Sequence, residues 1–245
     1  MRVVINKKRV SRNRKIAQYA FFITLGILVL GLFVTNAAPT NPILFFSPVI
    51  VLPVAIIATL FSVRMANLWL REPRPEVIFK NGLKGLSSRS VLYHYVFDAR
   101  HVLISPEGVF TFTVRQQDGY FTVNGNNWRK RGGIFSKFTT LFRQDMLGKP
   151  DQDAAKDQAA IQALIDQVAP DSGITVEAVI LFTSENATVE VTDSDYPVIY
   201  ADPKNKPNLK TFFRDAKKRE TNASLDQEQI EALENLLAVE LEEMA

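Results

Sequence analysis

Residues 100–115, RHVLISPEGVFTFTVR, contain the pattern that decides the fold of the C-terminal part of this chain. Apolar residues alternate up to the turn sequence SPEG at 105–108 and resume directly after it. Alternation on both sides of a short turn predicts two antiparallel strands. Because the side chains of a strand alternate between its faces, Thr113 and Arg115 of the second strand share one face.

Helix and strand patterns alternate on either side of this hairpin. A helix is predicted from Pro150, with an apolar stripe that includes Ile161 and Ile165, and the apolar run 174–182 predicts a buried central strand. A short helix leading into a strand is predicted at 81–95, and further strands are predicted at 119–123 and 197–200. The stretch 129–147 is basic and is expected to be irregular. Two more helices are predicted, one at 209–218 and one that begins after a Ser224–Gln227 capping box. This order predicts an α/β domain, in which helices pack on a mixed sheet.

Charge is divided unequally along the chain. Residues 1–76 contain ten Lys or Arg and two acids, a net charge of +8, whereas residues 77–245 contain nineteen Lys or Arg and twenty-four acids, a net charge of −5. Such a division predicts a basic, membrane-proximal part followed by a separate soluble domain. The chain contains no cysteine, which excludes disulfides, zinc sites with thiolate ligands and thiol nucleophiles.

Two long apolar runs in the first part predict transmembrane helices. Residues 16–34 and 43–63 carry no charged side chain over nineteen and twenty-one residues, respectively. At about 1.5 Å per helical residue, each run spans roughly the 30 Å hydrocarbon core of a bilayer. Pro48 and Pro53 in the second run are tolerated if a neighbouring helix covers the carbonyl groups that they leave free. The short connection TNAAPTNP at 35–42 favours an antiparallel helical hairpin.

Two other interpretations fit these runs less well. A cleaved signal peptide shares the basic start, and a small-residue site at 36–38 would suit it, but its apolar region usually spans only about 7–15 residues. Two buried helices of a soluble core would not need forty charge-free residues in two runs. The predicted organisation is therefore a basic tail (1–15), a transmembrane hairpin (16–63), a linker (64–76) and a soluble domain (77–245).

The flanking charges predict the orientation of the hairpin. The first fifteen residues carry seven Lys or Arg and no acid, and Arg64, Arg71 and Arg74 follow the second run, whereas the connection is uncharged. Because an excess of Lys and Arg marks the cytoplasmic side, we expect a multi-pass protein of the cell membrane with both termini in the cytoplasm. Nucleic-acid binding is an alternative use of the basic tail, although the positive-inside rule already accounts for its charge.

The soluble region resembles the nuclease-related domain (NERD) family, a branch of the PD-(D/E)xK restriction-endonuclease-like superfamily. The resemblance covers residues 77 to about 239, two-thirds of the chain, and rests on order and spacing rather than on one motif. The residues that carry it are HVLISPEGVF at 101–110, QDG at 117–119, Trp128, GKP at 148–150 opening a helix, the strand end VILFT at 179–183, and the closing helix at 225–237. It implies a mixed-sheet restriction-endonuclease-like domain, which in this chain is preceded by the transmembrane helical hairpin predicted above from the apolar runs.

In that family, an Asp precedes the His of the first strand and Glu-x-Lys stands in the second. The two carboxylates hold a divalent metal, and the Lys helps to position or activate water. The corresponding positions here are Arg100, Thr113 and Arg115. Hard cations such as Mg²⁺ need oxygen ligands, and a permanently charged arginine beside them would repel the ion by several kcal/mol. The resemblance therefore implies a degenerate nuclease site, with no catalytic residues and no resident cofactor.

Two nearby acids are candidates to replace the missing carboxylates. Asp98 lies two residues before Arg100 and is the better candidate, and Asp118 follows Arg115 by three. Their simpler roles are an ion pair of Asp98 with Arg100 and, for Asp118, the first position of an Asp-Gly turn. If either acid helps to hold Mg²⁺ or Mn²⁺, the domain is an active nuclease. Three further side chains are expected to be packed rather than to act as ligands or base-stacking platforms: His94, His101 and Trp128.

A basic stretch follows the hairpin, interleaved with phenylalanines at 135, 138 and 142. We call its cations the basic lip, which comprises Arg115, Arg129, Lys130, Arg131, Lys137 and Arg143. Such a lip is suited to hold nucleic acid through its phosphates or to lie against anionic lipid headgroups, and a solvated loop without a ligand is the third interpretation. The last helix has eight acids and no base from residue 220 onward, which is typical of a solvated amphipathic face.

These patterns leave two classes of function. The favoured one is a membrane-anchored, cytoplasmic NERD-like module that does not catalyse and that binds or scaffolds nucleic acid or a protein partner. The alternative is an active metal-dependent nuclease with relocated acidic ligands. The two differ in one chemical requirement, because only the nuclease needs carboxylates grouped around a metal.

Overall fold

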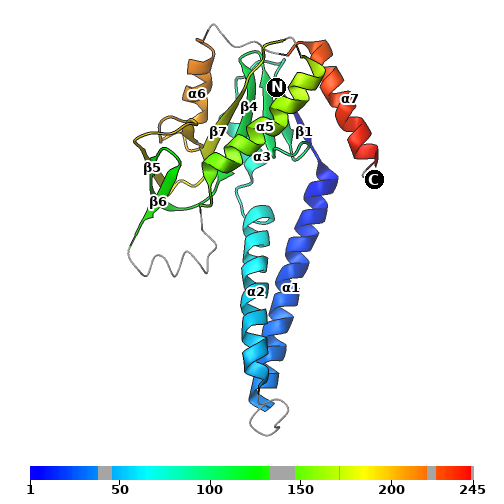
Figure 1. Ribbon diagram of the computed structural model, residues 1–245, viewed down its shortest axis with the longest axis vertical. Helices are drawn as coiled ribbons and strands as arrows, with labels where there is room; N and C mark the ends of the chain where they lie inside the picture. The colour runs from blue at the N-terminus through cyan, green and yellow to red at the C-terminus, as the bar shows by residue number, and fades with distance from the viewer. Residues whose placement is uncertain (38–45, 133–146, 171, 220–224, 244–245) are drawn as a thin grey trace. The chain divides into compact units, whose positions relative to one another are not determined.

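The computed structural model describes the chain apart from residues 38–45, 133–146, 171, 220–224 and 244–245, and for residues 236–243 it describes the backbone only. The chain divides into two compact units. One unit consists of residues 1–6, 73–133 and 147–245, and the other is built mainly on residues 7–72. Figure 1 labels the elements of both units.

Two helices within residues 7–72 are long and apolar enough to cross a membrane. Helix α1 spans Lys7–Ala37 and helix α2 spans Ser47–Trp69, and only 11% of the apolar window of each is buried inside the protein. The core helices of a soluble protein would be mostly buried, so this exposure suggests association with a membrane. The predicted run 16–34 lies inside α1, and the described part of the run 43–63 lies in α2 from Ser47 onward.

Small residues let α1 and α2 approach closely. The Thr24 hydroxyl donates to the Ala58 carbonyl oxygen at 3.1 Å, and a Cβ atom added at Gly31 would lie 2.6 Å from Val51 Cγ1. Thr24 of α1 is paired with Ala58 of α2, whereas Gly31, later in α1, lies beside Val51, earlier in α2. The two helices are therefore antiparallel. Small residues at such an interface are typical of helices that pack inside membranes. The predicted antiparallel pair of helices is therefore confirmed.

The first unit is built on a mixed sheet of six strands in the order β1-β2-β3-β4-β7-β9. Their bounds are Arg2–Ile5 (β1), Val91–His94 (β2), His101–Ser105 (β3), Gly108–Arg115 (β4), Val176–Phe182 (β7) and Val198–Tyr200 (β9). Strands β2, β3 and β4 are antiparallel to their neighbours in that group, whereas β1 is parallel to β2, and β4, β7 and β9 are mutually parallel. The predicted hairpin at 100–115 is β3 and β4, and the α/β class with a mixed sheet is confirmed.

Helices cover both faces of this sheet. The bounds of these helices are Pro75–Gly82 (α3), Pro150–Val168 (α5), Leu209–Ala216 (α6) and Gln227–Glu243 (α7). Leu103 and Phe110 belong to the core under α3 and α6, whereas Val102 and Val109 belong to the core under α5 and α7. This alternation follows from the period of two in a strand, and it explains why both faces of β3 and β4 are apolar. Figure 1 shows α5 lying across β4 and β7.

A second sheet has three strands in the order β6-β5-β8. Its strands are Gly119–Asn124 (β5), Asn127–Arg131 (β6) and Ala187–Val191 (β8). Phe121 on its inner face packs with Phe182 of β7 and Tyr200 of β9, so that this sheet is fixed to the carboxyl end of the central strands. The strand predicted at 119–123 is β5.

The first residues of the chain are part of a sheet. Residues 1–15 are predicted to be one basic tail, but Arg2–Ile5 form β1 and α1 begins at Lys7. Val3, Val4 and Ile5 are three consecutive apolar residues, and so short a run shows neither the helix period nor the strand period. The sequence pattern therefore does not reveal that these residues pair with the edge of β2.

Three local predictions differ from the structure. The helix expected within 81–95 lies earlier, as α3, because Pro75 suits the first turn of a helix. The stretch 129–147, expected to be irregular, begins inside strand β6. Ser224 of the predicted capping box lies outside the described residues, and the reciprocal cap of α7 joins Asp226 to Gln229 through hydrogen bonds of 2.8 and 3.0 Å.

Candidate functional site

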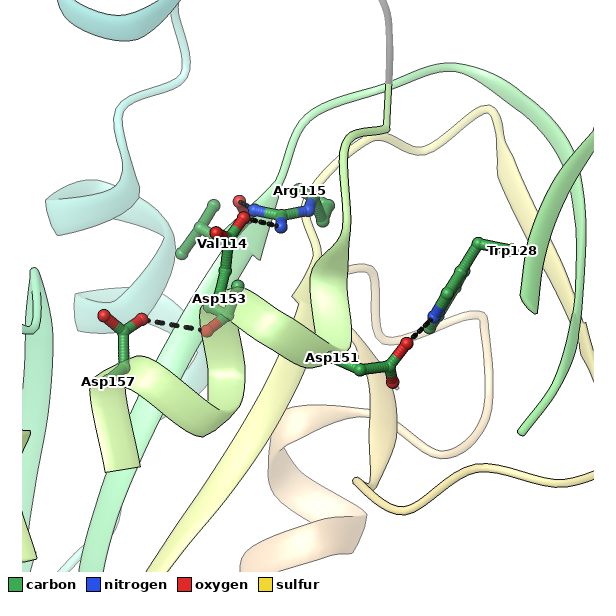
Figure 2. A network of polar contacts seen from close by, with 7 residues as sticks. Val114, Arg115, Trp128, Asp151, Asp153 and Asp157 are labelled. Carbon is green, nitrogen blue, oxygen red and sulfur yellow. Dashed lines mark hydrogen bonds and ion pairs between the residues drawn. The ribbon is translucent and has the colours of Figure 1, made fainter. Parts of the chain in front are cut away.

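The positions that the resemblance assigns to a nuclease triad lie against helix α5. The Thr113 hydroxyl donates to Asp157 Oδ2 at 2.9 Å, and Arg115 Nη2 donates to Asp153 Oδ2 at 2.5 Å. Figure 2 shows Arg115 and Asp153 pointing toward one another. We call these four residues the strand–helix clamp.

The clamp forms because side chains on one face of α5 line up with side chains on one face of β4. Asp153 and Asp157 are four residues apart on α5, and the same stripe continues as Ile161 and Ile165. These isoleucines pack with Val109, which shares the face of β4 that carries Thr113 and Arg115. The aliphatic residues of α5 therefore lie against the aliphatic start of β4, and the acidic residues of α5 lie against the polar end of β4.

Arg115 is the more buried partner of its ion pair. Its side chain is 12% exposed, against 57% for Asp153. Burial lowers the pKa of Arg115, and the Asp153 carboxylate opposes that shift. Arg115 Nη1 also donates to the Val114 carbonyl oxygen at 3.2 Å, while Nε is buried without a hydrogen-bond partner among the described residues. The guanidinium is therefore held by groups of the protein and turned toward α5.

Asp157 interacts with all three positions that the resemblance assigns to the triad, with Thr113 through a hydrogen bond and with Arg100 and Arg115 through their charges. Burial raises its pKa, whereas the hydrogen bond from Thr113 and the positive charges of Arg100 and Arg115 oppose that shift. The carboxylate that binds the Thr113 hydroxyl thus comes from the helix rather than from β4. The structure places Thr113 and Arg115 together against α5, and Arg100 acts on Asp157 through its charge.

A third acid of α5, Asp151, lies beside Trp128. The Trp128 indole N–H donates to Asp151 Oδ2, as Figure 2 shows. Asp151 is only 5% exposed, its Oδ1 is buried without a partner, and burial raises its pKa. Trp128 stacks on Phe182 with the ring centroids 6.1 Å apart, so the indole covers the core, as expected.

The acids proposed from sequence lie elsewhere. Asp98 is exposed in the bend between β2 and β3, and Asp118 accepts a hydrogen bond from the Ser184 hydroxyl. The carboxylates beside Thr113 and Arg115 come from α5 and were missed. Their signal was present in the sequence, because Asp153 and Asp157 extend the stripe that predicts the buried face of that helix.

Within the ranges that the structure describes, no group of three or more His, Cys, Asp or Glu is arranged to hold a metal ion. The two histidines form a buried pair across β2 and β3, with His94 Nδ1 and His101 Nδ1 2.8 Å apart. Burial lowers the pKa of His94 to about 4 and lowers that of His101 well below its usual range. Both rings are therefore neutral near pH 7, and one Nδ1–H donates to the other ring.

The basic lip is divided among several surfaces. Arg129 and Arg131 are exposed on the outer face of β6. Lys130 points to the opposite face, where its Nζ lies 5.8 Å from the centroid of the Phe121 ring. Arg115 belongs to the clamp, and Lys137 and Arg143 lie outside the described residues. The described part of the lip with free access to a large ligand is the pair on β6.

Comparison of the chain with models of protein families, with curated proteins and with solved structures found no match. The resemblance to nuclease-related domains therefore rests on the residues quoted above.

Proposed function

We propose that this protein is a membrane-anchored, non-catalytic module related to nuclease domains, and that it binds nucleic acid at the cytoplasmic face of the cell membrane. The strand–helix clamp is the observation that supports this proposal. Where the resemblance expects two metal-binding carboxylates and a lysine, the chain has Arg100, just before β3, and Thr113 and Arg115 in β4. The carboxylates that face them are already hydrogen-bonded to the strand.

A metal ion would have to compete with the clamp for its ligands. Asp153 would exchange a hydrogen-bonded guanidinium for the ion, and the Arg115 charge would remain beside it. At an effective dielectric of 20, two unit charges 4 Å apart interact by about 4 kcal/mol, and a divalent ion doubles that repulsion. The clamp is therefore suited to fix α5 to the sheet, and poorly suited to hold Mg²⁺ or Mn²⁺.

The outer face of the three-stranded sheet supplies the proposed contact with nucleic acid. Arg129 and Arg131 stand two residues apart on the exposed edge strand β6, and the Arg131 guanidinium lies 5.5 Å from the centroid of the Tyr120 ring. Arginines beside a partly exposed aromatic ring, such as that of Tyr120, combine phosphate attraction with a surface for stacking bases. Glu190, which accepts a hydrogen bond from Tyr120, lies on the same face and limits the net charge of the patch.

The charge of the flanks supports the cytoplasmic location. Lys and Arg are concentrated in residues 1–15, before the apolar run of α1, and at Arg64, Arg71 and Arg74, after the apolar run of α2. Such an excess favours the cytoplasmic side at both ends of the helical pair. A reporter fused after Ala245 should therefore be found in the cytoplasm. Digestion of that reporter by a protease added to intact cells would contradict the proposed topology.

Binding is tested with the full chain in nanodiscs and a fluorescent DNA duplex or RNA strand over a range of salt concentrations. Replacing Arg129 and Arg131 by alanine should weaken binding irrespective of sequence. The slope of log affinity against log salt should fall by about 1.8 for duplex DNA if each arginine meets one phosphate. The matched control removes two exposed charges from the loop between α3 and β2, Lys84 and Arg89, and should bind normally.

Two outcomes would contradict the nucleic-acid proposal. One is a full chain that binds neither probe at low salt, and the other is equal loss of binding in both double variants. Binding to phosphatidylglycerol vesicles that depends on Arg129 and Arg131, without binding to either nucleic acid, would identify a lipid surface as the ligand instead.

An active nuclease is the second candidate, because the structure contains acids that the strand lacks. Asp153 and Asp157 lie beside the triad positions and would be the relocated ligands. The same nanodisc preparation, incubated with labelled DNA or RNA and Mg²⁺ or Mn²⁺, should give no cleavage if the first proposal holds. Cleavage that disappears in an Asp157→Asn variant would support the nuclease.

A further inference from the structure

Strand β1 belongs to the sheet of the first unit, although both long helices lie between it and β2 in the chain. The Arg2 N–H donates to the Ser90 carbonyl oxygen at 2.8 Å, and the Asn6 N–H donates to the His94 carbonyl oxygen at 3.1 Å. These bonds lie at the two ends of a parallel pairing that includes Val3 with Leu92. The edge of β2 is therefore covered by the start of the same chain.

A side chain of β1 also reaches the last helix. Arg2 forms a hydrogen-bonded ion pair with Glu234 of α7, and the Tyr93 hydroxyl donates to the same Glu234 Oε1 at 2.5 Å. Burial and the Glu234 carboxylate raise the pKa of Tyr93, so that its hydroxyl remains a donor at all physiological pH values. Neighbouring Ile230 and Leu233 of α7 are buried in the core on that face. Arg2 and Tyr93 thus bind α7 at the turn that follows its buried residues.

We propose that β1 is a strap that closes the soluble unit only when both ends of the helical pair emerge on the same side of the membrane. The inference rests on the membrane crossing in the proposed function. Strand β1 ends at Ile5 and α1 begins at Lys7, whereas α2 ends at Trp69, and the sheet is entered again at Val91. Because α1 and α2 are antiparallel, one hairpin returns the chain to the strand that it left.

The strap couples correct insertion to the closure of the fold. A chain whose first residues remain on the far side of the membrane cannot pair β1 with β2. The backbone groups of β2 would then be an open edge, and Glu234 would lose its cationic partner. The first consequence is local opening of β2, and the second is release of α7.

Proline substitution distinguishes pairing from simple loss of side chains. Backbone groups that face a neighbouring strand recur at every second residue, so the N–H of Val4 points to β2 and that of Val3 points away. Val4→Pro should therefore break the strap, whereas Val3→Pro is the matched control on an edge strand. Hydrogen exchange of the full chain in nanodiscs should become about tenfold faster or more in β2 and α7 for Val4→Pro only.

Cysteine cross-linking tests the same pairing if the proline variant is not produced. The natural chain has no cysteine, so only introduced thiols react. Arg2 and Val91 are paired across strands that lie about 4.8 Å apart, within the Cα separation of disulfides of about 4.4–6.8 Å. Mild oxidation of isolated membranes should remove both thiols of Arg2→Cys/Val91→Cys. The control Val3→Cys/Val91→Cys points its thiols to opposite faces and should stay reduced.

The outcomes separate this inference from the proposed function. Equal exchange in Val3→Pro and Val4→Pro, or equal cross-linking of both cysteine pairs, overturns the strap. Faster exchange in β2 with unchanged exchange in α7 overturns the coupling through Arg2 and Glu234. A protein that binds no nucleic acid but gives the expected exchange and cross-links refutes the binding proposal and leaves the strap standing.

Discussion

Replacing Thr113 with valine should destabilise the protein through the strand–helix clamp alone. Valine keeps the branched shape of threonine, and Thr113 is 4% exposed, so packing changes little. The substitution removes the hydrogen bond of 2.9 Å to the half-buried Asp157 carboxylate. A hydrogen bond to a charged group contributes about 1.5–3 kcal/mol, which corresponds to roughly 3–12 °C in the melting temperature of a domain of this size.

The size of this loss should depend on pH. Burial raises the pKa of Asp157, and the Thr113 hydrogen bond opposes the shift, so Thr113→Val should raise that pKa further. A carboxyl whose pKa is higher in the folded state than in the unfolded state destabilises the fold at pH values above its folded pKa, and this cost disappears when it is protonated. The effect of Thr113→Val should therefore be largest near pH 7 and should shrink as the pH falls toward the acid range.

Strand β4 offers a matched control two residues away. Thr111 is on the same face and fully buried, but its hydroxyl has no hydrogen-bond partner in the part of the chain that the structure describes. Thr111→Val should be neutral or stabilising, because it removes an unsatisfied polar group. Melting is followed by circular dichroism of the full chain in nanodiscs. Equal losses for the two valine variants, or a loss for Thr113→Val that is unchanged in an Asp157→Asn background, would refute the assigned role of the clamp.

Two further outcomes concern other buried contacts. The pKa of His94 is lowered to about 4 from its ordinary 6.5, so stability should be complete above pH 6.5 and fall by up to about 3 kcal/mol as the pH drops toward 4. Thermal melting at pH 7.5 and 4.5 checks this, and an equal melting temperature at both would contradict the buried, neutral pair with His101. Gly31→Ala should lower the melting temperature of the full chain, because its Cβ would lie 2.6 Å from Val51 Cγ1. Gly26 has open space at its Cβ, so Gly26→Ala should be neutral or stabilising, and the reverse order would contradict the packing of α1 on α2.

Elements with a strong local pattern were predictable from the sequence. The hairpin of β3 and β4 and the apolar strand β7 carry their own periods, and α5 has an aliphatic stripe over several turns. Strands β1 and β8 were not predicted, because whether these residues form strands depends on the strands with which they pair. Arg2–Ile5 pair with residues 91–94, far away in the sequence, and no local rule identifies that edge.

The candidate site divides in the same way. Arg100, Thr113 and Arg115 were identified from the hairpin, since a strand period fixes which side chains share a face. Their partners Asp153 and Asp157 were not, because the register of a helix against a strand depends on tertiary packing. The compensating acid predicted from closeness in the sequence is therefore Asp98, whereas the acids that lie near Thr113 and Arg115 in the structure come from α5. Proximity along the chain was the wrong guide.

The strap also determines which form of the protein is suitable for functional assays. A fragment that begins at residue 77 lacks β1, and it begins inside helix α3, whose first turn is Pro75 and Glu76. Its β2 strand would be an open edge, and Glu234 would keep Tyr93 but lose Arg2. An open edge promotes pairing between molecules, so such a fragment should aggregate or bind non-specifically. Absence of cleavage by that fragment would not count against a nuclease, and binding by it would not count for nucleic-acid recognition. Joining residues 1–6 to residue 73 by a flexible linker should restore a monomer if the strap inference is right, and continued aggregation of that fusion would count against it.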